Sequence, residues 1–230
     1  MKIALIHGQS HKGSTYHISR LLAEKLGGEI TEFMLPRDFS DHCLGCCTCF
    51  EISEKKCPHR SRLEPIVKAI DEADVIILAS PVYVMHTSGS MKNLLDHMGW
   101  RWTIHRPEAK MFTKQAVCIS TAAGMGMKSA NKDMSDSLFF WGVGKIYRYG
   151  AAVRESSWEK VDPAMKQKIS RSMDKLADTV YENIGRVTPS VKTKTMFEII
   201  RQMRFIYGTD KDIKYWKKKG WLEKKRPWKE

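Results

Sequence analysis

The sequence contains no long apolar run. No stretch approaches the roughly 18 apolar residues that a membrane-spanning helix requires. The apolar run at residues 3–6 is too short for a signal peptide, and no small-residue cleavage site follows it. We therefore expect a cytoplasmic protein, whose cysteines stay reduced and serve metals or redox chemistry rather than disulfides.

Two common nucleotide-binding motifs are also missing. Gly8 and Gly13 have the separation of a P-loop, but Ser14 stands where that motif requires lysine. The dinucleotide fingerprint Gly-x-Gly-x-x-Gly is absent as well. The sequence therefore gives no support to nucleotide hydrolysis by a P-loop.

The loop that follows the first apolar run is rich in small and hydroxylated residues. Such a loop directs backbone N–H groups, hydroxyls and the dipole of the next helix at one spot, which suits a phosphate. Ser10, Ser14 and Thr15 supply hydroxyls, Lys12 adds positive charge, and Gly13 permits close backbone approach. The alternative is an ordinary strand-to-helix turn capped by Ser14 or Thr15. We predict a cradle for a terminal phosphate monoester.

Strand-like and helical patterns alternate along most of the chain. Strands are expected at residues 3–6, 29–34, 75–79, 116–120 and 145–153, and helices at 15–26, 63–72, 90–97, 128–139 and 162–184. This alternation predicts an α/β fold, a doubly wound five-stranded parallel sheet with helices on both faces. The polar interruptions of the last strand indicate an edge. Ligands bind at the carboxyl ends of such strands, which directs attention to the loops there.

Two further loops begin where predicted strands end. In the first, a proline-fixed turn followed by Tyr83 would present backbone and a ring edge to a flat aromatic ligand, or the tyrosine packs on its neighbours. The second, residues 121–126, is composed of small residues and is either a plain turn or a backbone platform for a polar ring edge.

These three loops together resemble those of the flavodoxin-like NAD(P)H-dependent FMN reductases. The similar segments are residues 8–15, Ser80-Pro81-Val82-Tyr83 with Met91-Lys92-Asn93-Leu94-Leu95-Asp96, and residues 121–126. The resemblance covers roughly residues 1–185 and implies strand order 2-1-3-4-5, bound FMN, NAD(P)H as co-substrate, and a homo-oligomer, either dimer or tetramer. Relatives often carry arginine where this chain has His97, and we assign His97 no role.

The resemblance also implies roles for individual residues. It assigns the FMN phosphate to Ser10, Lys12, Gly13, Ser14 and Thr15, the isoalloxazine ring to Pro81, Val82, Tyr83 and Val84, and the polar edge of the ring to Thr121, Ala122, Ala123 and Gly124. No catalytic side chain is assigned, because in flavoenzymes the flavin carries the chemistry.

Five of the six cysteines lie within residues 43–57. Cys43, Cys46, Cys49 and Cys57 have the spacing C-x₂-C-x₂-C-x₇-C, and the first three match the compact ferredoxin spacing. The segment looks like that of the iron–sulfur flavoproteins, a branch of the same family, which implies a [4Fe–4S] cluster on these four residues. The alternatives are a zinc site, or free or redox-labile thiols. The sixth, Cys118, is expected in the core.

The C-terminal region is strongly basic. Residues 188–230 contain 13 Lys/Arg and 5 Asp/Glu, which is +8 of the total charge of +13. Apolar residues at helical spacing predict one stripe opposite Arg201 and Arg204. The stripe comprises Met196, Ile199, Ile200, Met203, Ile206 and Tyr207.

Such a helix can bind an anionic membrane or nucleic acid. We favour docking on the domain or on a second subunit, with the lysines facing water. We expect a flavodoxin-like FMN-binding domain at 1–187 and a basic, aromatic-rich helical extension at 188–230.

The favoured function is an FMN-dependent oxidoreductase that passes electrons from NAD(P)H to a small acceptor such as a quinone, a flavin or a metal centre, through a [4Fe–4S] cluster if one is present. The alternative is a non-enzymatic electron carrier of flavodoxin type. Flavodoxins are usually shorter and acidic, whereas this chain is long and basic. A nucleic-acid-binding function depends on the tail alone and is not favoured.

Overall fold

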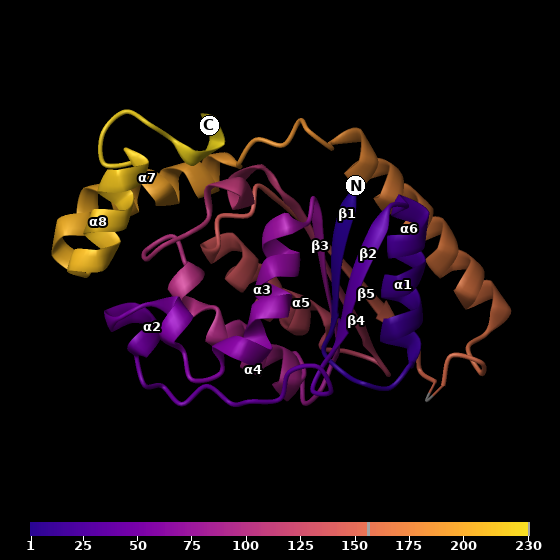
Figure 1. The fold of residues 1–230 in the computed structure, drawn as a ribbon. Helices are drawn as coiled ribbons and strands as arrows, with labels where there is room; N and C mark the ends of the chain where they lie inside the picture. The colour runs from indigo at the N-terminus through magenta and orange to yellow at the C-terminus, as the bar shows by residue number, and fades with distance from the viewer. Residues whose placement is uncertain (156, 230) are drawn as a thin grey trace.

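The computed structural model describes residues 1–155 and 157–229. A five-stranded parallel sheet lies between two layers of helices (Figure 1). The strands are β1 (Lys2–His7), β2 (Glu29–Met34), β3 (Val75–Pro81), β4 (Gln115–Ala122) and β5 (Lys145–Ala152), in the order β2-β1-β3-β4-β5. The doubly wound sheet predicted from the sequence is confirmed, with β5 at an edge.

The five helices expected from the sequence are present, four between strands and one after the last strand. They are α1 (Ser14–Leu26), α3 (Arg60–Glu72), α4 (Gly89–His97), α5 (Met127–Phe140) and α6 (Pro163–Glu182). A short α2 (Thr48–Glu51) and the 3₁₀ helices η1 (Glu54–Lys56), η2 (Gly99–Arg101) and η3 (Ala109–Thr113) lie in the connections. Helices α1 and α6 cover one face of the sheet, and α3, α4 and α5 cover the other (Figure 1).

The central strand shows why both faces are covered. All of β3 is buried: Ile76 and Leu78 pack with α3 and α4, whereas Val75 and Ile77 pack with α1. Successive side chains of a strand point to opposite faces, so a continuous apolar strand requires two apolar partners. Each such side chain contributes about 1.5–3 kcal/mol when fully buried.

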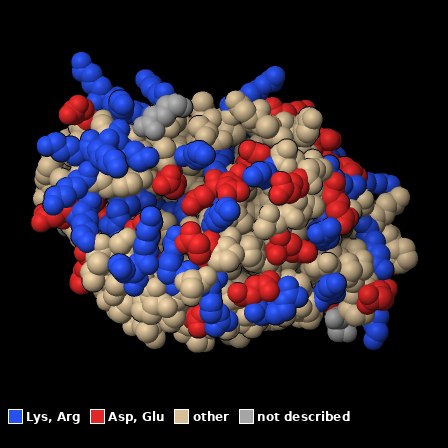
Figure 2. Space-filling view, in the orientation of Figure 1, with Lys and Arg blue, Asp and Glu red and all other residues tan. Residues whose placement is uncertain are grey.

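The C-terminal region forms a third apolar cluster. It contains α7 (Val191–Tyr207), α8 (Asp210–Lys219) and η4 (Pro227–Lys229). Phe197 and Trp221 pack against Phe112 of η3. Trp216 stacks on Phe197 at 4.7 Å between ring centroids, and its indole donates to the His105 carbonyl oxygen at 2.8 Å. The tail thus docks on its own chain at the segment that precedes β4. Figure 2 shows Lys and Arg side chains over this side of the molecule.

The predicted apolar stripe of this tail is wrong in part, because Ile200 packs against the third cluster but other members of the stripe are exposed. Ile199 and Ile206 are 53% and 73% exposed, whereas Phe197 and Arg204 are buried. The guanidinium of Arg204 donates to backbone carbonyls of residues 103 and 104 and lies 4.0 Å from the Trp216 ring centroid. An aromatic ring and backbone carbonyl oxygens can stabilise a buried arginine. The charge of a side chain therefore does not decide which face of a helix points inward.

The Tyr207 side chain, which we placed on the stripe, lies outside the described residues. Within the part of the chain that the structure describes, no helix is both long and apolar enough to cross a membrane.

Candidate functional site

The three loops singled out in the sequence meet at the carboxyl edge of the sheet. The hydroxyls of Thr15 and Thr121 are 2.6 Å apart and buried, and the Val82 amide donates to the Thr121 carbonyl at 2.8 Å. Between the loops lies a cavity of about 170 Å³. Its lining consists of Gln9, His11, Gly13, Ser14, Thr15, Pro81, Val82, Tyr83, Thr121, Ala122, Ala123, Val153 and Glu155.

The N-terminus of α1 opens onto this cavity. Gly13 is the N-cap and has no side chain to accept from the first-turn amides. The Ser14 hydroxyl is buried without a hydrogen-bond partner among the described residues, and the Thr15 hydroxyl bonds to Thr121. Neither hydroxyl therefore caps the helix, in contrast to the ordinary-turn alternative. Free amides, a helix dipole and an unsatisfied hydroxyl make an anion site.

The structure does not bring Ser10 and Lys12 onto the cavity lining. The Ser10 hydroxyl donates to the Leu35 carbonyl at 3.1 Å, which joins the loop to the end of β2. The Lys12 ammonium lies 5.5 Å from the centroid of the Tyr16 ring.

The loop after β3 forms a tight turn at the mouth of the cavity. Tyr83 and His86 exchange backbone hydrogen bonds of 2.9 and 3.1 Å, and the tip residues Val84 and Met85 have φ of 47° and 70°. Non-glycine residues adopt this left-handed region rarely, and such strain collects at functional sites. Tyr83 is 48% exposed and faces the cavity, whereas Val84 is 94% exposed and lies at the tip.

The loop after β4 lies against this turn. Gly126 has φ +94°, and a Cβ there would lie 2.5 Å from Cγ1 of Val82. Glycine at this position therefore lets the two loops touch. Ala122 and Ala123 line the cavity, whereas Gly124 has open space around it and is exposed.

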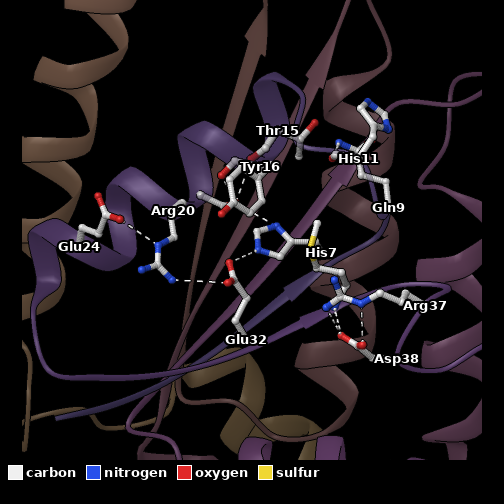
Figure 3. A network of polar contacts seen from close by, with 12 residues as sticks. His7, Gln9, His11, Thr15, Tyr16, Arg20, Glu24, Glu32, Arg37 and Asp38 are labelled. Atoms are coloured by element: carbon white, nitrogen blue, oxygen red, sulfur yellow. Dashed lines mark hydrogen bonds and ion pairs between the residues drawn. The ribbon is translucent and has the colours of Figure 1, made fainter. Parts of the chain in front are cut away.

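A polar network behind the cavity ties β1, α1 and β2 together (Figure 3). The buried His7 ring bonds through Nε2 to Glu32 at 2.8 Å, and Arg20 joins Glu32 at 3.5 Å and Glu24 at 2.8 Å. Burial lowers the pKa of His7. The network anchors the first turns of α1 behind the anion site.

Four lining residues of the cavity were not among the predicted site residues: Gln9, His11, Val153 and Glu155. Gln9 is 6% exposed, its amide nitrogen donates to the His11 carbonyl at 3.2 Å, and its Oε1 has no partner among the described residues. Gln9 lies within the predicted phosphate loop, between Gly8 and Ser10, so its position in the sequence could have identified it as a site residue. Glu155 lies beyond β5, and nothing in its local sequence indicated the site.

The four cysteines of the ferredoxin-like spacing lie together. Cys43, Cys46, Cys49 and Cys57 line one small cavity of about 60 Å³ beside the C-terminal end of α4. Burial, together with the neighbouring thiols of Cys57, Cys43 and Cys46, raises the pKa of Cys49 to about 11. Four thiols that converge on one cavity are a ligand set that a metal centre would stabilise as thiolates.

The other two cysteines have different surroundings. Cys47 also borders the cavity, but its backbone is left-handed, with φ 55°, and its thiol points to the Gly45 carbonyl at 3.5 Å. Cys118 is buried in β4, as expected for a core residue.

Family comparison matches residues 1–156 to the model described as NADPH-dependent FMN reductase. The chain belongs to this family. It is therefore a flavoprotein oxidoreductase that uses FMN and a nicotinamide nucleotide, and the three converging loops lie inside the matched part of this FMN reductase.

Curated relatives carry a second feature. An iron-sulfur flavoprotein of Archaeoglobus fulgidus is 28% identical over 206 residues, 86% of this chain and 88% of that protein. An iron-sulfur flavoprotein of Methanocaldococcus jannaschii is 43% identical over 67 residues, which cover 29% of this chain and 34% of the relative.

Solved structures share the fold. An FMN-dependent NADH-azoreductase from Bacillus anthracis has a TM-score of 0.58 at 12% identity. The match covers 79% of the present chain and 100% of the azoreductase chain. FerB, an NAD(P)H:acceptor oxidoreductase from Paracoccus denitrificans, has a TM-score of 0.59 at 16% identity. This match covers 81% of the present chain and 98% of the FerB chain.

Proposed function

We propose that this enzyme passes electrons from NAD(P)H to a small one-electron acceptor, with FMN at the three loops and a [4Fe–4S] cluster on the cysteine segment. FMN, when bound, accepts a hydride and can release its electrons singly, and a cluster carries one electron at a time. The observation that carries this proposal is that one chain holds both an unsatisfied anion cradle and four converging thiols.

The cradle fits the phosphate of FMN. The phosphate would be bound by the first-turn amides of α1, by the buried Gln9 side chain and by the Ser14 hydroxyl, which has no partner in the described part of the chain. The cavity of about 170 Å³ is smaller than the roughly 300–1,000 Å³ of pockets for ligands of this size. We therefore assign the phosphate end to the cavity and the ring to the surface formed by Pro81, Tyr83 and the backbone of residues 121–124.

The mouth of the site supports a homo-oligomer. Tyr83, Val84, Met85 and Met125 are exposed apolar side chains on the two loops that border it. A second copy of the chain would cover them and exclude water from the ring. Gly124 and Val84, which are exposed here, would then contact FMN or the partner rather than solvent.

The cysteine cavity fits an iron–sulfur cluster by donor chemistry. Cys43, Cys46, Cys49 and Cys57 supply four thiols from one short segment. Asn93 of α4 accepts from the Cys43 amide at 3.3 Å and donates to the Asp41 carbonyl at 2.6 Å, which fixes the start of the segment against α4.

An anaerobic experiment tests both halves. The full chain, purified without oxygen, is expected to contain stoichiometric FMN, iron and acid-labile sulfide, and NADPH or NADH should bleach the flavin absorbance rapidly. Cys46→Ser should retain FMN and its bleaching but lose the iron. Stoichiometric FMN without iron or sulfide would refute the cluster, and flavin that only a partner reductase can reduce would indicate a flavodoxin-type carrier instead.

A further inference from the structure

Two histidines join the cysteine cavity from different elements. His59 is the N-cap residue of α3, and His97 is the last residue of α4, 38 positions away along the chain. Their Nδ1 and Nε2 atoms lie 2.9 Å apart. Together with the Cys57 thiol, these ligand atoms all lie within 4.8 Å of one another.

The His97 ring is fixed in the orientation of a metal ligand. Its Nδ1 bonds to the Asn93 carbonyl at 2.9 Å, and because a carbonyl only accepts, this nitrogen carries the proton. The lone pair of Nε2 is therefore directed at His59. The Phe39 ring makes a T-shaped contact with the imidazole, at 4.8 Å between centroids, and His97 is 5% exposed. Metal-binding histidines characteristically donate their other ring nitrogen in this way.

We propose that Cys57, His59 and His97 form a binding site for Zn²⁺, which shares Cys57 with the four-cysteine site but takes its other two protein ligands from histidines. One thiolate and two neutral imidazoles are ligands that Zn²⁺ prefers. With Zn–N of about 2.0–2.1 Å and Zn–S of about 2.3 Å, a tetrahedral ion separates the nitrogens by about 3.3 Å and places the sulfur about 3.6 Å from each. Small side-chain adjustments around the observed positions reach that geometry.

Zinc binding requires no reactant other than the ion and water, and each proton that moves can be accounted for. Cys57 releases its thiol proton as the zinc–sulfur bond forms. His59 and His97 bind as neutral rings, and the proton that His59 shares with His97 in the metal-free chain moves to the other ring nitrogen of His59. Water completes the fourth position.

The zinc site and the iron–sulfur site exclude each other, because both require the Cys57 thiolate. Zinc-loaded chains would therefore be unable to complete a four-cysteine cluster. The zinc proposal itself does not depend on FMN or on iron.

Metal titration of the cluster-free full chain tests the proposal. The protein is purified anaerobically, stripped with a chelator and titrated with Co²⁺, whose thiolate charge-transfer band reports cysteine ligation, and then with Zn²⁺ in competition with a chelating dye. One Zn²⁺ should displace one Co²⁺. His59→Gln and His97→Gln should each weaken Zn²⁺ binding by about tenfold or more, and Cys57→Ser should abolish the charge-transfer band.

Two matched variants separate this site from its neighbours. His42→Gln removes an exposed histidine next to the cysteines, and Cys46→Ser removes a thiol that the cluster needs but the zinc site does not. Both should bind Zn²⁺ as tightly as the parent chain. Unchanged affinity in both His59→Gln and His97→Gln, or equal weakening by Cys46→Ser and Cys57→Ser, would overturn the proposal in favour of an all-cysteine site. Thermal unfolding of each metal-free variant verifies that it is folded.

Discussion

Ser10 and Ser14 belong to one loop, yet their hydroxyls lie in different surroundings. The Ser14 hydroxyl is buried at the start of α1 and has no partner among the described residues, whereas that of Ser10 already donates to the Leu35 carbonyl. An unpaired buried hydroxyl is costly, and a bound phosphate removes that cost. The loop composition alone could not distinguish the two serines, because that depends on which neighbouring carbonyl each one meets.

The first prediction follows from this difference. Ser14→Ala should weaken FMN binding by about 10- to 100-fold, since a hydrogen bond to a charged group is worth about 1.5–3 kcal/mol. Ser10→Ala should change it much less, because that hydroxyl serves the protein itself. Fluorescence titration of the deflavinated protein with FMN measures both constants. Equal losses in the two variants would contradict the assignment of Ser14 as the phosphate donor.

The second prediction concerns the buried His7. Because burial lowers its pKa below the ordinary 6.5, the unfolded chain binds this proton more readily than the folded one. His7 therefore contributes stability above pH 6.5 that is lost as the pH falls towards its folded pKa. His7→Gln, which can still bond to Glu32, should flatten the decline of the unfolding free energy between pH 7 and 5.

Chemical denaturation across that pH range measures this slope. His42→Gln, which replaces an exposed histidine, is the control and should keep the parent slope. If His7→Gln also keeps the parent slope, the folded protein holds His7 no differently from the unfolded chain.

At the scale of elements, α8 fixes the cysteine segment from the outside. The buried Asp212 forms a capping box with Thr209 at the start of α8, in which each side chain accepts from the other residue's backbone amide. Asp212 also pairs with Arg106, whose guanidinium donates to the Cys49 carbonyl. Lys211 donates to the Ile52 carbonyl beside it. The basic tail therefore helps to shape the thiol cavity, a role that its charge pattern did not indicate.

The third prediction tests this connection. Asp212→Asn should lower the unfolding free energy by about 3–5 kcal/mol, as expected when one partner of a buried ion pair is removed. It should also increase hydrogen exchange in residues 46–57. Asp210→Asn, in the exposed first turn of the same helix, should cost no more than about 1 kcal/mol and leave that exchange unchanged. Equal exchange in both variants would mean that α8 does not hold the segment.

Sequence patterns were most informative where contacts are local or periodic. Continuous apolar strands and the glycine-marked loops at their ends predicted the sheet and the position of its ligand edge. Two features could not be predicted from the sequence, for the same reason: which face of α7 is buried, and the contact between His59 and His97. Each depends on a partner far along the chain: Phe112 for Phe197, and α4 for the start of α3. Helical spacing shows which residues share a face but not which face is covered.

At the scale of the whole molecule, the described chain contains three apolar clusters, and the third is shared. Phe112 belongs to the connection before β4, while Phe197, Trp216 and Trp221 come from the tail. We expect a segment that completes the packing of a core aromatic to unfold together with that core. The boundary between residues 187 and 188, predicted from the sequence, would then not be a boundary in folding.

The last prediction separates these two possibilities. The full chain should unfold in one calorimetric transition, because each of the large tail aromatics contributes on the order of 3–5 kcal/mol when buried. A chain ending at residue 187 should unfold at lower temperature and bind a hydrophobic dye, since Phe112 loses its cover. Trp216→Phe keeps most of the buried area and loses the bond to His105, so it should have an intermediate stability. Two transitions, with the upper one matching the shortened chain, would instead show that the tail folds as a separate unit.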